Sequence, residues 1–212
     1  MQGRGVPAKA AFPSSFSYGN DAVETVSYDP DGAKKLLEES GWTDTDGDGY
    51  VDKDGQKLSI NWLTYPTRLE QPKLAEYAQA TLKDIGIDVV VNNTSDHMTI
   101  AKSGDFDVYV SSTTTAPTGD PEYFFTSTVT GAKNYGNYQN EEVTKLTDQL
   151  HQTFDKDERA KLAVELQQDI LDDDAFFFVS HLNMGIVTKS NVKGMAAHPC
   201  DYYEITADLD VE

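Results

Sequence analysis

Cysteine is almost missing from this sequence, because Cys200 is the only one among 212 residues. No intrachain disulfide can form, so oxidative cross-links do not hold the fold together. Long apolar runs are missing as well. The longest, Ala175–Val179, has the length of a strand and is far shorter than the ~20 residues of a membrane-spanning helix. The fold must therefore depend on a core built from the 38% of residues that are hydrophobic.

Basic residues are also scarce. The chain has 17 Lys and Arg against 36 Asp and Glu, which gives a net charge of -19. A surface of this sign repels phosphate backbones and anionic lipid headgroups. The composition therefore argues against nucleic acid as a partner and favours cationic or neutral ligands, although an acidic surface also serves solubility alone.

The motifs of nucleophilic and phosphate chemistry are absent. The sequence has no Gly-x-Ser-x-Gly elbow, no P-loop and no dinucleotide fingerprint. Its histidines do not have the spacing of zinc ligands. They are His97, His151, His181 and His198. No nucleophile–base arrangement is recognisable, so we predict that the protein is not an enzyme.

The middle of the chain has the pattern of a βαβ unit. Alternating apolar residues predict a strand over 58–64, apolar residues at helical spacing predict a helix over 69–85, and a β-branched run predicts a strand over 87–91. A short helix over 96–103 and a third strand over 106–110 follow. Strands that are joined by a helix in this way run parallel. We therefore expect an α/β fold with a mixed, mostly parallel sheet flanked by helices.

Helix start and stop signals are clear at several places. Asp29 followed by Pro30 predicts a helix that ends at Gly41. Asn140 and Asp155 have the positions of N-cap residues before two later apolar-periodic segments. These signals predict three helices outside the βαβ unit.

Other stretches lack a clear period. Residues 1–28 are rich in Gly, Pro, Ser and aromatics, which predicts an extended connector, and residues 116–139 predict a loop with a short helix from Pro121. Residues 176–179 and 184–188 have the apolar character of strands. The opening residues carry no apolar signal-peptide core, so we expect that the chain begins within a longer protein.

Residues 44–55 alternate carboxylates with other residues and have Gly49 at the sixth position. An EF-hand calcium loop places its oxygen ligands around such a glycine. The matching ligand positions are held by Asp44, Asp46, Asp48, Tyr50 and Asp52. The twelfth position is Gly55 in place of a bidentate glutamate, and no helix pattern follows. A calcium site and an ordinary Gly/Asp-rich turn therefore both remain open.

Several phrases occur in one order along the chain. They are Tyr28–Trp42 (YDPDGAKKLLEESGW), Asp46–Gly49 (DGDG), Leu82–Ile87 (LKDIGI), Gly104–Asp107 (GDFD), Gly119–Pro121 (GDP), Tyr138–Asn140 (YQN) and Asp157–Arg159 (DER). This ordered set resembles the large extracellular solute-binding proteins of ABC importers for oligopeptides, dipeptides and nickel (family 5). The resemblance covers nearly the whole chain.

The resemblance implies a lobe of the periplasmic-binding-protein type II kind, in which two lobes enclose a ligand cleft. We expect residues 1–28 to be a connector from a missing N-terminal lobe, residues 29–180 to be the C-terminal α/β lobe, and residues 181–212 to return toward the other lobe. Membership would also imply an ABC permease as the partner of the full-length protein. The full-length protein would act in the periplasm, or at the extracellular face of the cytoplasmic membrane through a lipid anchor.

The resemblance further implies a ligand cleft where the chain leaves the third strand, because open α/β sheets bind ligands at the carboxyl ends of their strands. The cleft candidates are Thr113, Thr114, Thr115, Thr118, Asp120 and Tyr135. Residues 116–121 resemble the nickel-type branch more than the peptide-type branch, which often has an acidic residue near the place of Pro117. A histidine of some nickel binders corresponds to Ala132 or Lys133. The resemblance thus favours a small peptide or a chelated nickel ion held by Thr, Asn and Tyr groups, and leaves that choice open.

Two functions of other classes are weighed against this one. A calcium-binding extracellular module built on residues 44–55 would be expected to repeat its loop, and one copy exists. A hydrolase fragment would need a nucleophile beside a base.

If the chain is one lobe of a clamp, a ligand stabilises the closed state through contacts from both lobes, so the isolated chain should bind weakly.

Overall fold

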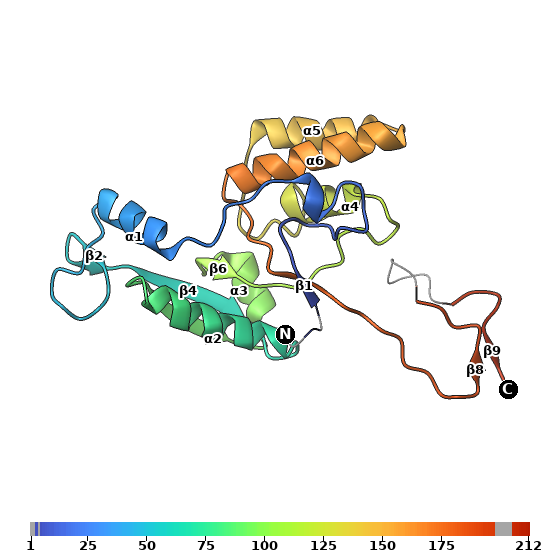
Figure 1. Cartoon of the computed structure of the whole chain (residues 1–212), viewed down its shortest axis with the longest axis horizontal. Helices are drawn as coiled ribbons and strands as arrows, with labels where there is room; N and C mark the ends of the chain where they lie inside the picture. The colour runs from blue at the N-terminus through green and yellow to red at the C-terminus, as the bar shows by residue number, and fades with distance from the viewer. Residues whose placement is uncertain (1–2, 4, 198–204) are drawn as a thin grey trace. The chain divides into compact units, whose positions relative to one another are not determined.

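The computed structural model describes residue 3, residues 5–197 and residues 205–212, so His198 and Cys200 lie outside the described residues. The chain divides into two compact units (Figure 1). Unit 1 comprises Met1–Thr25 and Thr113–Glu212, and unit 2 comprises Val26–Ser112. Within the described residues, no helix combines the length and the apolar character that a membrane crossing requires. The three-part division of the full-length protein, with its boundaries at 28 and 180, stays a prediction.

Unit 2 is built on a parallel sheet in the order β5-β4-β6. The central strand β4 (Ser59–Thr64) pairs over its whole length with β5 (Asp88–Asn93) and at two positions with β6 (Val108–Tyr109). Helix α2 (Glu70–Lys83) connects β4 to β5 and packs against both, and α3 (His97–Ser103) follows β5. The predicted α/β class and the predicted βαβ unit are thus confirmed.

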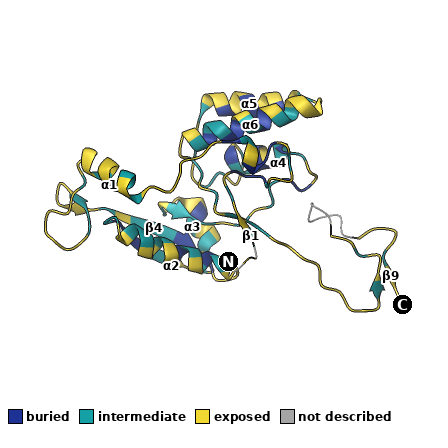
Figure 2. Ribbon diagram, viewed as in Figure 1, coloured by how far each residue is buried: buried dark blue, intermediate teal, exposed yellow. Residues whose placement is uncertain are grey.

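The remaining elements of unit 2 precede the sheet in sequence. Helix α1 (Pro30–Glu39) begins at the predicted cap, where Asp29 Oδ1 accepts a hydrogen bond from Gly32 N at 2.9 Å. None of its residues is buried, as Figure 2 shows. Strands β2 (Asp52–Lys53) and β3 (Gln56–Lys57) form an antiparallel hairpin. Residues 44–55, the Asp/Gly loop, therefore lead into a hairpin and not into a helix.

Unit 1 is mainly helical. The short α4 (Glu122–Phe124) continues into η2 (Phe125–Val129), and the longer α5 (Glu141–Gln152) and α6 (Lys156–Asp172) lie side by side (Figure 1). Both long helices begin at the predicted caps: the Asn140 and Asp155 side chains each accept two backbone N–H hydrogen bonds. The core between these helices contains Phe124, Phe125, Val143, Leu150, Leu166 and Ile170. In Figure 2, dark blue marks buried residues on α4, α5 and α6.

Residues 1–28 are not merely a connector, contrary to the sequence-based expectation. They contain β1 (Gly5–Pro7) and the short η1 (Asn20–Ala22). Phe12 is fully buried in the core of unit 1 and packs edge-on against Phe124, with 5.9 Å between the ring centroids. Phe12 and Tyr18 are therefore core residues, which a sequence window without periodicity did not reveal.

The expected strands at 176–179 and 184–188 are both wrong in their placement. The strand of this region is β7 (Ser180–Leu182), which pairs antiparallel with β1. The run before it is apolar because Phe176 and Phe178 pack on Phe124. Residues 184–188 have no described strand partner, and Val187 is 96% exposed. The chain then forms a small antiparallel pair of β8 (Val192–Lys193) and β9 (Asp210–Val211).

Candidate functional site

The predicted cleft segment, residues 113–121, follows β6 (Val108–Tyr109) and begins unit 1's second stretch at Thr113. Thr113 and Thr118 are exposed, and Thr114 and Thr115 are half-buried. The segment is fastened near its end, because the Tyr18 hydroxyl donates to the Gly119 carbonyl at 2.8 Å. Tyr135 is half-buried in the loop that follows η2. The structure thus places threonine hydroxyls on an anchored loop directly after a parallel strand.

Asp120 has both carboxylate oxygens engaged within unit 1. Arg159 donates to Oδ2 from Nε at 2.9 Å and to Oδ1 from Nη2 at 2.6 Å. Oδ1 also accepts the backbone N–H of Glu122 at 2.9 Å, at the start of α4. Arg159 further donates to the carbonyls of Leu150 and Thr153 at the end of α5. Asp120 therefore joins the cleft segment to α4, α5 and α6.

Glu122 extends this network. Its Oε2 accepts a hydrogen bond from Arg159 Nη2 at 2.9 Å, and its Oε1 lies 2.6 Å from His151 Nδ1. Burial alone would raise the pKa of Glu122, but the hydrogen bonds from His151 and Arg159 outweigh it and hold the pKa below its ordinary value. The carboxylate is therefore kept ionised as part of the scaffold under the cleft segment.

The carboxyl edge of the sheet in unit 2 carries an aromatic cluster. Tyr65, directly after β4, is buried and its ring stacks on that of His97 with 4.1 Å between centroids. His97 Nδ1 lies 2.8 Å from the hydroxyl of Tyr109, the last residue of β6. Sequence reasoning missed this cluster, because it considered histidines for zinc spacing alone. The available signal was a histidine at the start of a helix that follows the carboxyl end of a predicted strand.

The Asp/Gly loop brings three of its carboxylates together. One oxygen from each of Asp44, Asp46 and Asp48 lies within 4.8 Å of the others, and all three residues are exposed. Asp44 accepts the backbone N–H groups of Gly47 and Gly49 at 2.7 and 3.0 Å. Oxygens that converge in this way are a ligand set suited to calcium, and the backbone hydrogen bonds also hold the loop in this shape without an ion.

Other members of the predicted calcium set have partners of their own. Asp48 Oδ2 lies 2.5 Å from Lys57 Nζ, and this contact holds the pKa of Asp48 below its ordinary value. The Asp52 carboxylate accepts from Thr45 N and Oγ1 at 2.9 and 2.7 Å. The Tyr50 ring has the same Lys57 ammonium 4.3 Å from its centroid. A calcium ion would thus compete with Lys57 for Asp48.

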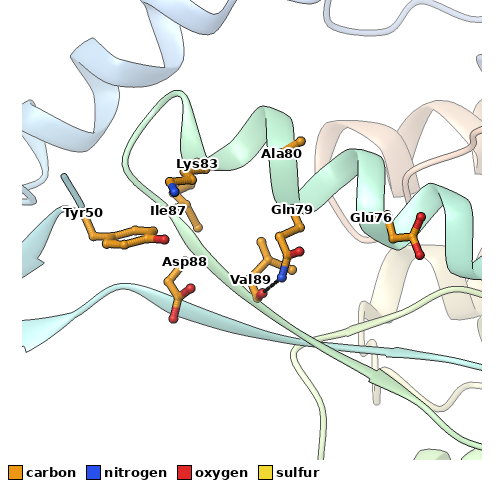
Figure 3. A pocket seen from close by; sticks show the side chains of 8 residues that line it. All are labelled: Tyr50, Glu76, Gln79, Ala80, Lys83, Ile87, Asp88 and Val89. Carbon is orange, nitrogen blue, oxygen red and sulfur yellow. Dashed lines mark hydrogen bonds between the residues drawn. The ribbon is translucent and has the colours of Figure 1, made fainter. Parts of the chain in front are cut away.

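A hollow of about 300 Å³ lies beside this loop (Figure 3). It is lined by Tyr50, Glu76, Gln79, Ala80, Lys83, Ile87, Asp88 and Val89. Figure 3 shows Gln79 directed at Val89, whose carbonyl accepts its amide N–H at 2.6 Å. The hollow is at the amino end of β5, opposite the edge at which parallel sheets bind ligands, so it is not the predicted cleft.

A family model described as "Bacterial extracellular solute-binding proteins, family 5 Middle" matches residues 1–136. Among curated relatives, the oligopeptide-binding protein AppA of Bacillus subtilis is 30% identical over 200 residues, which cover 91% of this chain and 37% of AppA. The nickel-binding periplasmic protein of Escherichia coli is 26% identical over 201 residues, covering 91% of this chain and 38% of the relative.

A solved structure extends the likeness to three dimensions. NikA from Staphylococcus aureus, in complex with Ni(L-His)2, aligns with a TM-score of 0.78 and 26% identity over 100% of this chain and 44% of NikA. The chain thus spans under half the length of each of these relatives. The predicted fold, that of one lobe region of a periplasmic binding protein, is confirmed by this match.

Proposed function

The chain belongs to family 5 of the bacterial extracellular solute-binding proteins, and we propose that it is the cleft-forming part of a receptor that delivers peptides or nickel chelates to an ABC importer. The observation that carries this proposal is the family match over residues 1–136. Relatives named for oligopeptides and for nickel support both ligand classes. The full-length protein would act outside the cytoplasmic membrane, in the periplasm or through a lipid anchor, and would present its ligand to a membrane permease.

The proposed action is binding without catalysis. The described relatives are named as binding proteins. A ligand would be held between this chain and a second lobe, and the closed state would be favoured because only there are both sets of contacts made. The acidic composition, with its net charge of -19, suits neutral or cationic cargo.

Within this chain we propose that the threonines of the cleft segment contact the ligand. Thr113, Thr114, Thr115 and Thr118 lie on the loop that leaves β6, and Tyr135 lies on the loop after η2. Asp120 acts by positioning that loop, because its carboxylate is engaged by Arg159. Hydroxyl groups of this kind can donate to and accept from a peptide backbone or a chelator carboxylate.

Native mass spectrometry of the full-length protein, purified from its own host, tests the proposal. A copurifying peptide or nickel complex supports it and selects between the two classes. A copurifying sugar, or a protein that binds neither peptides nor nickel chelates when these are supplied, contradicts it.

The isolated chain gives a second test of the two-lobe mechanism. It should bind either ligand class with an affinity no better than the millimolar range, because the contacts of the second lobe are missing. Calorimetry with the isolated chain would contradict this mechanism by showing submillimolar affinity for one of these ligands.

Calcium binding by the Asp/Gly loop is a second candidate function. The specific observation that favours it is the convergence of the Asp44, Asp46 and Asp48 oxygens within 4.8 Å. Asp52 and the Tyr50 carbonyl would complete the ligand set by analogy with an EF-hand loop. Such an ion would stabilise unit 2 and need not participate in transport.

A further inference from the structure

We propose that the hollow between α2 and β5 is a second binding site, and that it takes a dipeptide in its free, zwitterionic form. This inference goes beyond the proposed function, because the hollow shares no residue with the cleft candidates. Every residue that lines it falls within Val26–Ser112. The site is therefore complete within unit 2.

Strand β5 has a free edge beside the hollow. It is the first strand in the order β5-β4-β6, so β4 is its one neighbour within the described residues. The N–H groups of Asp88 and Thr94 each donate at 3.0 Å to a carbonyl on the β4 side. Because parallel pairing alternates along a strand, the backbone groups of Val89 and Val91 face the free edge. An extended peptide can add to an edge of this kind as a further strand.

The side chain of Gln79 already pairs with one group of this edge. Its Nε2 donates to the Val89 carbonyl at 2.6 Å, as Figure 3 shows. This contact leaves the N–H of Val89 and both backbone groups of Val91 for a ligand. The Oε1 atom of Gln79 is a further acceptor beside them. The hollow thus offers both donors and acceptors to a peptide backbone.

The two ends of the hollow carry opposite charges. Figure 3 shows Tyr50 and Lys83 at one end and Glu76 at the other. Lys83 Nζ lies 5.8 Å from the centroid of the Tyr50 ring. Neither Lys83 nor Glu76 forms an ion pair with a described residue. Asp88 also lines the hollow, but its Oδ2 accepts a hydrogen bond from Ser59 Oγ at 3.1 Å. A ligand carboxylate beside Lys83 and a ligand ammonium beside Glu76 would give each side chain a partner.

The separation of these two charges indicates the length of the ligand. Glu76 and Lys83 lie on one face of α2, and their positions in the helix are about 10.5 Å apart along the axis at 1.5 Å per residue. A dipeptide spans at most about 7 Å. With one charge-assisted hydrogen bond of about 2.8 Å at each end, it matches this separation to within the reach of the two flexible side chains.

The direction of the ligand follows from the βαβ connection. A short turn joins the end of α2 to the start of β5, so the helix and the strand run in opposite directions. A dipeptide with its ammonium at Glu76 and its carboxylate at Lys83 runs in the direction of α2. It therefore lies antiparallel to β5, and antiparallel strands form regular backbone hydrogen bonds.

The wall between the charged ends is apolar. It consists of Ile87 and Val89, which are 9% and 2% exposed, together with Ala80. Apolar surface with a few polar groups at fixed places is typical of small-molecule sites, and about 300 Å³ is at the small end of their range. A zwitterion is also neutral overall, which suits a chain with a net charge of -19 better than an anion does.

Amide nuclear magnetic resonance of the 212-residue chain, titrated with unblocked alanylvaline, tests the site. The amide signals of Val89 and Val91 should shift and saturate in the millimolar range, because the hollow is open and small. Saturable shifts confined to residues 113–118, or no saturable shift anywhere, overturn the inference.

Blocked ligands test the two charged ends. N-acetyl-alanylvaline lacks the ammonium and alanylvaline amide lacks the carboxylate, so each should bind the unmodified chain at least about threefold more weakly, as expected for loss of an exposed ion pair. Equal binding of the three ligands by the unmodified chain overturns the inference.

Variants assign each preference to a side chain. Glu76→Gln should lose the preference for a free ammonium, and Lys83→Gln the preference for a free carboxylate. Lys73→Gln, at an exposed position of α2 outside the hollow, is the matched control and should keep both preferences. Preferences that persist in Glu76→Gln and Lys83→Gln overturn the inference, and they leave the proposed cleft unaffected because it lies in other residues.

Discussion

Arg159 holds Asp120 through two hydrogen bonds, Nε to Oδ2 at 2.9 Å and Nη2 to Oδ1 at 2.6 Å. The two residues are 39 positions apart in the sequence. The Arg159 side chain is 13% exposed and also satisfies two carbonyls at the end of α5. Planar pairs of this kind are stronger than neutral hydrogen bonds and restrict geometry. The cleft segment is therefore held by the helical unit from which Arg159 extends.

Asp120→Ala should destabilise unit 1. It leaves the guanidinium of Arg159 without its main partner, and we expect a loss of about 2 kcal/mol in the free energy of unfolding, as is usual for hydrogen bonds to charged groups. Denaturant unfolding measures this change. Asp148→Ala, an exposed position on α5, is the matched control and should change stability by less than about 0.5 kcal/mol. Equal stabilities for the two variants would show that the pair is not structural.

The burial of Phe12 leads to a second prediction. Phe12→Ala should lower the free energy of unfolding of unit 1 by about 4 kcal/mol, the usual cost of removing a buried aromatic ring. Tyr28→Ala, at a residue that is 85% exposed, should stay within about 0.5 kcal/mol of the unmodified chain. If Phe12→Ala were as mild as Tyr28→Ala, residues 1–28 would be a connector after all.

Stability should fall as the pH is lowered below about neutrality, partly because of His181. This residue lies on β7, where its Nε2 is 3.1 Å from Asn20 Oδ1, and burial lowers its pKa from the ordinary value of 6.5. Because the folded-state pKa is below the unfolded-state value, the unfolded chain binds the proton more readily. The contribution of His181 to the free energy of unfolding is therefore complete above pH 6.5. It is lost as the pH falls from there through the lowered pKa of the folded state.

His181→Gln should flatten this part of the profile, because glutamine keeps a hydrogen-bond donor but does not titrate. Thermal melts between about pH 7.5 and 5, on either side of the ordinary histidine pKa, give the comparison. Glu122, whose pKa lies below the ordinary value of 4.5, affects stability only at lower pH. That part of the stability profile should be unaffected by His181→Gln. An unchanged slope in His181→Gln would assign the acid sensitivity to other groups.

Calcium should raise the melting temperature of unit 2 if the Asp/Gly loop binds it. The gain in the free energy of unfolding depends on the ratio of the calcium concentration to the dissociation constant. It is about 2.7 kcal/mol when the concentration is a hundredfold above that constant. Asp44→Asn should abolish the gain. Lys57→Gln should enhance it, because it removes the ammonium that contacts Asp48 at 2.5 Å.

The opposite directions of the two variants separate ion binding from a general salt effect. Magnesium at equal ionic strength is the control. A melting temperature that calcium leaves unchanged in both the unmodified chain and Lys57→Gln would identify the loop as a turn held by its own backbone hydrogen bonds.

Much of the fold was predictable from short-range pattern. Asp29, Asn140 and Asp155 were expected as caps, and each accepts backbone N–H groups of the next turn. The parallel pairing of β4 with β5 followed from a strand, a helix and a strand in succession. The family was also accessible, since its phrases are spread over nearly the whole chain.

The errors came from segments whose environment is distant in sequence. The run around Phe176 and Phe178 was expected to be a strand, but it is apolar because it packs on Phe124. Phe12 gave no periodic signal, because its burial depends on helices more than a hundred residues later in the numbering. Apolar content indicates burial, but does not indicate whether a sheet or an aromatic cluster provides it.

The sequence by itself determined the helices, the parallel order of the central strands and the family, because caps and hydrophobic periods act between residues at most a few positions apart. Only the tertiary structure decided that Asp120 is joined to Arg159 and that His97 lies on Tyr65 beside Tyr109. These contacts join residues from separate elements, and their distances are set by how the elements pack.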